Sequence, residues 1–320
     1  MYLKLSAKIE VKSTKIWTFE KVSSVEITLD SESLTDTCVI KLPKKIKWQN
    51  EAEIPLKRGD AVSVWLGYNG ELELAFTGYI RTVGFKNPVV ITCEDEMFRL
   101  KQIEAKKLSY KSVTLEKLLK EQDLGGRAVK VFGEQNIGQY RVTASTVAGL
   151  LGNLKENGIR SFFRMENGPP VLYCGVLFEK EKTHKYVFAT GINITKDEQL
   201  EYQSAEDVRL WVKAISLQPN NKKIKVEVGD KDGEKRTIHA YNKTEKELKA
   251  WAEQELKRLK QDGLTGSFTA FGSPMINKLD NIAIKLYGDR KGIYQVERNV
   301  IKYDTGNGFR QEITIGGRVG

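Results

Sequence analysis

The sequence has few of the side chains on which most catalytic and metal sites depend. Its 320 residues include three cysteines and two histidines. The cysteines, Cys38, Cys93 and Cys174, are far apart and odd in number. They predict neither a disulfide framework nor a zinc site, and they fit a reducing compartment. Proline is also scarce, at seven residues, and together with the glycine content this excludes collagen-like and low-complexity chains.

Two further absences concern membranes and nucleic acids. No apolar run reaches the roughly 18 residues of a membrane-spanning helix, and no block of about five or six like charges forms a basic tail. The net charge of +10 divides into −1 over residues 1–98, +6 over 99–180 and +5 over 181–320. Lysine outnumbers arginine 38 to 14, whereas bidentate base and phosphate recognition favours arginine. The charge therefore predicts a lysine-rich solvated surface with no specific nucleic-acid binding, and the lack of a long apolar run predicts no membrane span.

The composition is otherwise that of a globular protein, with 40% hydrophobic and 29% charged residues. The first hundred residues predict short strands, because apolar and polar side chains alternate between Gly, Asn and Pro turns. These predicted strands cover residues 25–29, 37–42, 60–66, 72–80 and 89–93. Such a series favours a barrel or sandwich, and we expect a first β-barrel domain over residues 1–98.

Residues 99–180 have a different pattern and predict a small α/β insertion. Helical spacing covers residues 112–122, and a second helix begins near Ser145, which can cap it. A hairpin follows, with strands at 159–165 and 171–174 and a turn at Asn167-Gly168-Pro169-Pro170.

The remaining residues, 181–320, predict a second β-barrel with an inserted helix at 244–260. Thr244 and Glu247 form a capping box at the start of this helix, which we expect to pack on its own barrel. The predicted strands cover residues 208–217, 223–228, 235–240, 266–271, 281–286, 292–300 and 309–315. The expected fold class is therefore mainly β with an α+β insertion: two tandem barrels plus a small α/β domain.

The two β regions resemble each other. Residues 58–66 align with residues 278–286, which places Asp60 over Asp280 and matches the apolar positions that follow. The correspondence continues through a longer strand and a closing strand: residues 78–83 over 293–300, and 90–93 over 312–315. Three strands in the same order predict a duplication. Three such chains would offer six similar units in a ring.

The candidate chemical motifs are weak. His184 and His239 each lack a second ligand at metal-binding spacing. Asp304-Thr305-Gly306 matches an aspartic protease tripeptide but has no second copy, so it predicts a turn, and the glycines that follow predict a hairpin. Glu94-Asp95-Glu96 predicts a loop or an acidic turn that leads into a helix. The sequence therefore predicts no catalytic, cofactor-binding or metal-binding residue and no enzyme. Four aromatic residues could stack on sugars or bases, although a barrel core and rim is the favoured interpretation: Trp65, Tyr68, Phe76 and Tyr79.

Two stretches carry a family resemblance. Residues 56–64, followed by 76–80, resemble the first barrel of the baseplate hub proteins of phage tails. The C-terminal run is similar to the hubs of contractile tails and of phage-like particles from Gram-positive bacteria. It comprises residues 248–256, 266–274, 280–284, 292–297 and 309–314. One departure is Leu279, where the family usually has glycine before the aspartate.

The resemblance implies a homotrimer that adapts symmetry. Its tandem barrels would form a pseudo-sixfold ring that meets the hexameric tail tube on one side and a spike or central tail protein on the other. It also implies the tape measure protein and other baseplate proteins as partners, and a place in the baseplate of a virion tail or tail-like particle assembled in the bacterial cytoplasm. The alternatives are a tail-associated cell-wall hydrolase and a carbohydrate-binding receptor protein.

Overall fold

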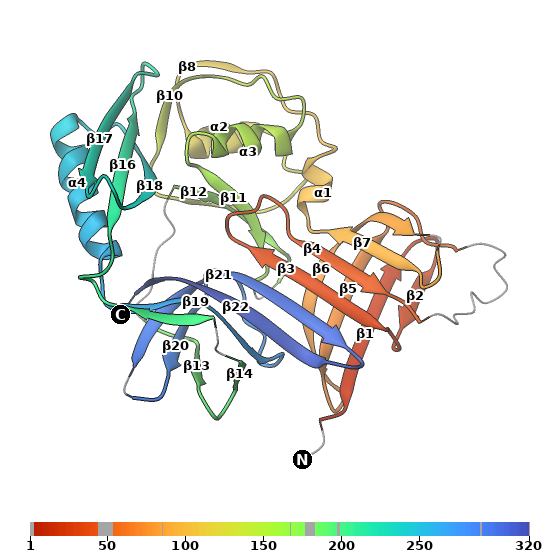
Figure 1. Ribbon diagram of the computed structural model, residues 1–320. Helices are drawn as coiled ribbons and strands as arrows, with labels where there is room; N and C mark the ends of the chain where they lie inside the picture. The colour runs from red at the N-terminus through yellow and green to blue at the C-terminus, as the bar shows by residue number, and fades with distance from the viewer. Residues whose placement is uncertain are drawn as a thin grey trace.

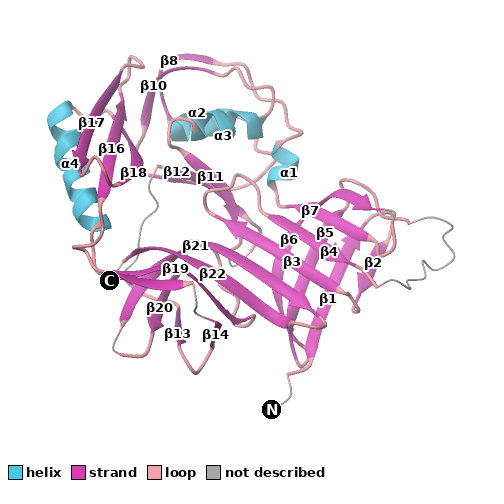
Figure 2. Ribbon diagram, viewed as in Figure 1, coloured by secondary structure: helices cyan, strands magenta, loops and turns pink. Residues whose placement is uncertain are grey.

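The computed structural model describes residues 3–43, 54–84, 86–166, 168–176, 183–196, 199–288 and 290–319. As the alternating pattern predicts, the fold is mainly β with small helical parts (Figure 2). One large sheet runs through both barrels in the order β14-β19-β22-β21-β3-β4-β7-β6-β5-β1-β2. None of the helices described has both the length and the apolarity needed to cross a membrane.

The first barrel is the set of strands β1 to β7, which surround one apolar core. Their bounds are β1 (Leu5–Lys12), β2 (Ile16–Phe19), β3 (Ser24–Asp30), β4 (Thr37–Lys41), β5 (Ala61–Tyr68), β6 (Glu71–Gly84) and β7 (Val90–Glu94). Alternate residues face the core, as period-2 patterning requires. In β5, for example, Val62, Val64 and Leu66 are buried while Ser63 is only half-buried.

The second barrel has its own apolar core. Its strands are β13 (Tyr186–Ala189), β14 (Ile194–Lys196), β15 (Leu200–Gln203), β19 (Gly263–Phe271), β20 (Asn281–Lys285), β21 (Lys291–Asp304) and β22 (Gly308–Arg318). Its first strand differs from that of the first barrel in direction: β13 is parallel to β20, whereas β1 is antiparallel to β5.

The α/β unit lies over the junction of the two barrels (Figure 1). It contains α1 (Met97–Leu100), β8 (Ser109–Thr114), α2 (Leu115–Glu121), β9 (Val129–Phe132), β10 (Asn136–Arg141), α3 (Val147–Lys155), β11 (Arg160–Arg164) and β12 (Val171–Gly175). The predicted hairpin is confirmed, because β11 pairs with β12; Asn167 of its turn lies outside the described residues. The caps of α2 and α3 are Thr114 and Thr146. The second cap is therefore one residue later than Ser145.

The helix predicted at 244–260 is α4 (Glu245–Leu259), and its capping box between Thr244 and Glu247 is confirmed. The expectation that it packs on the second barrel is wrong. Its buried residues Leu248 and Ala252 lie against a separate three-stranded sheet. That sheet consists of β16 (Leu210–Leu217), β17 (Lys223–Gly229) and β18 (Glu234–Tyr241). Alternation reveals a strand but not which sheet it joins, so the sequence assigned these strands to the barrel.

Candidate functional site

The same tight turn precedes β5 in the first barrel and β20 in the second. In the first barrel, Asp60 Oδ2 accepts a hydrogen bond of 2.9 Å from the Lys57 N–H. In the second barrel, Asp280 Oδ2 accepts one of 2.9 Å from the Asn277 N–H. Both aspartates are 6% exposed. The alignment of Asp60 with Asp280 is thus confirmed, since the two carboxylates close equivalent turns.

The long strand that pairs with β5 or β20, β6 in the first barrel and β21 in the second, carries the same β-bulge. The register shifts between Ile80 and Thr82 in β6 and between Val296 and Arg298 in β21. The closing strands align as the sequence predicts, with equivalent partners across the sheet: Ile80 with Cys93, and Val296 with Ile315. Because bulges fix the bend of a strand, the repeat extends to local geometry as well as to strand order.

The two barrels are joined by a strand junction. β21 continues past its bulge and pairs with β3 of the first barrel, from Arg298 opposite Asp30 to Asp304 opposite Ser24. Three side chains from the tip of the β21–β22 hairpin are buried in the core of the first barrel: Ile301, Tyr303 and Phe309. The hairpin therefore belongs to both barrels and fixes their relative position.

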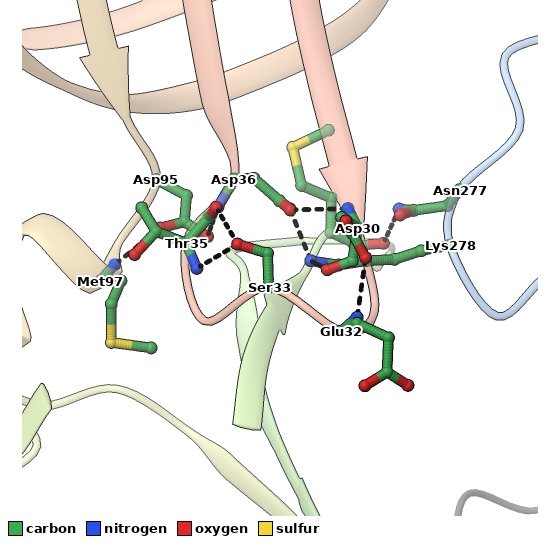
Figure 3. A network of polar contacts seen from close by, with 10 residues as sticks. Asp30, Glu32, Ser33, Thr35, Asp36, Asp95, Met97, Asn277 and Lys278 are labelled. Carbon is green, nitrogen blue, oxygen red and sulfur yellow. Dashed lines mark hydrogen bonds and ion pairs between the residues drawn. The ribbon is translucent and has the colours of Figure 1, made fainter. Parts of the chain in front are cut away.

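A buried polar network lies beside this junction (Figure 3). The Lys278 ammonium, with no exposed surface, contacts Asp36 Oδ2 at 2.6 Å. Asp36 Oδ1 accepts from the Asp30 N–H at 3.0 Å, and the Asp36 N–H donates to Asp95 Oδ2 at 3.1 Å. The other Asp95 oxygen accepts from the Met97 N–H at 3.0 Å. The network thus ties a loop of the second barrel to two loops of the first.

The network holds two carboxyl groups but only one ammonium group. Burial and, to a smaller extent, the nearby Asp36 carboxylate raise the pKa of Asp95 to about 8, although Lys278 opposes the shift. Burial also raises the pKa of Asp36, opposed by its contact with Lys278. The arrangement that balances charge at neutral pH is an ionised Asp36–Lys278 pair with a protonated Asp95.

Amide side chains hold the loop that carries Lys278. Asn299 Nδ2 donates to the Ile276 carbonyl at 2.7 Å and to Gln311 Oε1 at 2.9 Å. Gln311 Nε2 in turn donates to the carbonyls of Phe271 and Pro274, each at 2.8 Å. Asn299 and Gln311 are fully buried. The backbone polar groups of this irregular segment are satisfied by these side chains rather than by a strand partner.

A cleft of about 1170 Å³ separates the α/β unit from the barrels. Two arginines of the α/β unit reach across to carboxylates of the barrels. Arg164 contacts Asp280 at 2.6 Å, and Arg127 contacts Glu96 at 2.6 Å. Each barrel is therefore clamped to the α/β unit by an arginine–carboxylate pair.

The residues weighed from sequence are dispersed. His184 is exposed and His239 is half-buried against Gly158. Asp304 ends β21 and opens the predicted turn, where its carboxylate accepts from the N–H groups of Gly306 and Asn307. Glu94-Asp95-Glu96 leads into α1, as predicted. Among the described residues, no group of three or more His, Cys, Asp or Glu side chains could hold a metal ion.

The four aromatic residues lie in and around the first barrel. Phe76 is buried in its core. The Tyr68 hydroxyl donates to the Phe309 carbonyl at 2.5 Å, which ties the first barrel to the β21–β22 hairpin. Sequence reasoning missed the Asp36–Asp95–Lys278 network, because these residues are distant in the chain. The only signal was the acidic triplet that contains Asp95.

No protein-family model and no curated protein matches the sequence. The fold, however, matches solved structures of tail proteins. A tail protein from Neisseria meningitidis MC58 aligns with a TM-score of 0.63 and 12% identity, over 99% of this chain and 97% of that one. The 43 kDa tail protein of prophage MuSo2 from Shewanella oneidensis aligns with a TM-score of 0.61 and 17% identity, over 98% of each chain.

A third similar structure comes from a secretion system. It is an Escherichia coli component of the type VI secretion system that is described as structurally similar to the T4 phage tail proteins gp27 and gp5. It aligns with a TM-score of 0.53 and 11% identity, over 93% of this chain and 73% of that one. At these identities the comparisons establish a shared fold: that of phage tail proteins and their counterpart in a secretion system.

Proposed function

We propose that this protein is a structural hub of the baseplate of a phage tail or phage-like particle. In this role three chains form a ring of six barrels, which adapts the sixfold tail tube to a central spike of lower symmetry. The tube, the spike or central tail protein, the tape measure protein and other baseplate proteins are the partners. The particle is assembled in the bacterial cytoplasm, and a contractile tail from a Gram-positive bacterium is the finer assignment that the family resemblance implies.

The observation that carries the proposal is the duplicated barrel. The turn closed by Asp60 or Asp280 and the bulge that follows it recur in both halves of the chain. Two similar barrels per chain give six similar surfaces in a trimer, whereas two or six chains give four or twelve. Shape matching of this kind needs rigid barrel contacts and no reactive group.

The alternatives have less support from the site. A cell-wall glycosidase needs two carboxyl groups free to act across a cleft. In the cleft described above, Asp280 and Glu96 are each held by an arginine, and Asp95 is bonded to backbone N–H groups. A sugar-binding receptor would use exposed aromatic side chains, whereas Phe76 is buried and Tyr68 is bonded at the barrel junction.

The organisation proposed for the chain is a first barrel over residues 1–98, the α/β unit over 99–180 and a second barrel over 181–320, which the separate β16–β18 sheet and α4 interrupt. The boundary between 180 and 181 lies outside the described residues. The α/β unit clamps both barrels, so its place in the hub is to hold the two barrels of one chain at a fixed angle.

The test is the stoichiometry of the hub layer in intact particles, measured by electron cryo-microscopy. We expect one ring of three chains with six barrels facing the tube. Six copies in one ring, or a single copy on the axis, would refute the adapter role. Deletion of the gene separates the hub from a receptor: loss of a hub leaves no baseplate, whereas loss of a receptor leaves complete particles that fail to adsorb.

A further inference from the structure

The second barrel shows how one barrel accepts a strand from another. On one side of β21 lie two strands in succession: β20 pairs with residues Lys291–Gln295, and β3 pairs with residues Arg298–Asp304. The bulge separates the two pairings. The junction between the barrels therefore uses the part of β21 that its own barrel leaves free.

In the first barrel, the edge of β6 corresponds to this edge of β21, but no described strand takes the place of β3 there. β5 pairs with β6 only as far as Tyr79, and the turn adds bonds between Ile80 and residues Gly59 and Asp60. Beyond the bulge, Thr82 to Gly84 pair with β7 on one side. On the other side, where β21 receives β3, no strand lies among the residues that the structure describes. Thr82 is exposed, and Val83 is half-buried against the core of its barrel.

The second barrel, in turn, has a strand equivalent to β3 whose outer edge is free. This strand is β15, which pairs with β19 in the same way as β3 pairs with β4. When the two pairings are aligned, Gln203 of β15 is the counterpart of Asp30 of β3. The Ser267 N–H donates to the Gln199 carbonyl at 3.2 Å. Because backbone groups alternate in direction along a strand, those of Leu200 and Tyr202 point away from β19. Tyr202 is 46% exposed, on an edge that no described strand covers.

We propose that β15 of one copy pairs antiparallel with the free edge of β6 in the next copy. This inference rests on the proposed ring and names the contact that closes it. The register is that of the junction within the chain, so Thr82 lies opposite Gln203 and Val83 opposite Tyr202. Tyr202 then packs beside Val83, which covers an apolar side chain and an open strand edge that would otherwise invite aggregation.

If β15 pairs with this edge of β6, the two strands must come from different copies. Within one chain, strands β19, β22, β21, β3, β4 and β7 lie between β15 and β6 in the sheet. The edge of β3 is also already taken by β21. The contact is heterologous, since β15 of one barrel meets β6 of the other, and such contacts generate closed rings when the rotation permits.

A designed disulfide tests the register. Within the chain, Ser31 N–H donates to the Glu297 carbonyl at 3.0 Å, which makes the next pair, Arg298 and Asp30, a non-hydrogen-bonded one. The Cα atoms of such pairs lie about 4.5 Å apart, within the range that a disulfide spans. Thr82 and Gln203 occupy the same positions. The native cysteines are buried and do not interfere.

The experiment uses assembled particles that carry both Thr82→Cys and Gln203→Cys. After oxidation, we expect most of the chain to migrate as a covalent trimer in a non-reducing denaturing gel. The control carries Thr82→Cys and Leu200→Cys. Position 200 lies three residues from position 203, so its side chain faces the other side of the sheet. This control variant should stay monomeric. A ring of three chains in micrographs with no cross-link at 82 and 203 would overturn this contact and leave the hub role intact. A different copy number would overturn the hub role.

Charged substitutions at the same two exposed positions provide a second readout, because like charges should weaken the contact and opposite charges should restore it. Thr82→Asp with Gln203→Asp places two carboxylates face to face and should reduce the yield of particles at least tenfold, whereas Thr82→Arg with Gln203→Asp should restore it. The latter pair reproduces the Arg298–Asp30 pairing of the junction within the chain. Equal yields from both double variants would contradict the proposed contact, whatever the stoichiometry of the ring.

Discussion

The turn before β5 and the turn before β20 have the same backbone contacts but different surroundings. Arg58, before the first, is exposed and lies 5.5 Å from the ring centroid of Phe98. Its counterpart Lys278 is fully buried, paired with Asp36 and 4.6 Å from the ring centroid of Phe162. The duplicated backbone thus carries a solvated cation in one barrel and an interior ion pair in the other. What differs is the neighbour: in the second barrel this turn faces the first barrel.

Removal of the buried cation should have the largest effect. Lys278→Met keeps the length of the side chain but leaves the Asp36 carboxylate in the interior without its partner. We expect the free energy of unfolding to fall by about 3–5 kcal/mol, as measured by denaturant titration of the isolated chain.

Two variants serve as controls for this prediction. Arg58→Met, at the equivalent exposed position, should change the free energy of unfolding by no more than about 0.5 kcal/mol. Asp36→Asn combined with Lys278→Met should recover much of the loss, because it removes both charges together. Equal losses from Lys278→Met and Arg58→Met would mean that burial does not distinguish the two turns.

The network should also make stability depend on pH. Asp95 keeps its proton in the folded protein up to a pH of about 8, since its pKa is raised, but releases it near pH 4 when unfolded. Between these values the folded state binds the extra proton, so Asp95 makes the free energy of unfolding fall as the pH rises, by up to about 1.4 kcal/mol per pH unit. Its stabilising contribution is complete below about pH 4 and lost above about pH 8.

Denaturant titrations of the wild type and of Asp95→Asn at several pH values measure this contribution. The variant cannot ionise at this position, so its stability should decline less steeply over the same interval. If the two proteins have parallel profiles, Asp95 does not titrate in this range, and the proton in the network must be placed elsewhere.

The sequence predicted this fold where local rules decide it. Alternation located most barrel strands, and the box between Thr244 and Glu247 located the start of α4. The repeat was predicted correctly at Asp60 and Asp280, although the middle strands align one residue later than proposed: Ile80 corresponds to Val296 and not to Gln295. Alternation repeats every two residues and cannot fix a register to one residue.

What the sequence could not reveal is long-range partnership. The pairing of β21 with β3 joins segments at opposite ends of the chain, and Asp36 meets Lys278 across a similar separation. Nothing local marks either contact. For the same reason, the strands of the β16–β18 sheet were assigned to the barrel: each has the alternating pattern of a barrel strand, and only the packing of α4 distinguishes them.

A backbone position common to both turns provides a smaller test. Gly59 adopts a φ of +91°, and a Cβ built there would meet nothing within 4 Å. Gly59→Ala therefore adds left-handed strain without a steric clash, and we expect a loss of about 1–2 kcal/mol in thermal or denaturant unfolding. An unchanged stability would show that the turn relaxes to another conformation.

The smallest effect is expected at the matching residue, Leu279, which has a φ of +65°. Leu279→Gly relieves the strain of a left-handed leucine, worth about 1–2 kcal/mol, but it increases the freedom of the unfolded chain by about 0.5–1 kcal/mol. It also removes a side chain that packs beside Phe132, Phe162 and Tyr173. These contributions nearly cancel, so the net change should be less than about 1 kcal/mol. Leu279→Ala loses most of the packing and keeps the strain, and should therefore be less stable than Leu279→Gly. An alanine variant as stable as the glycine variant would mean that the second turn, unlike the first, does not require the left-handed conformation.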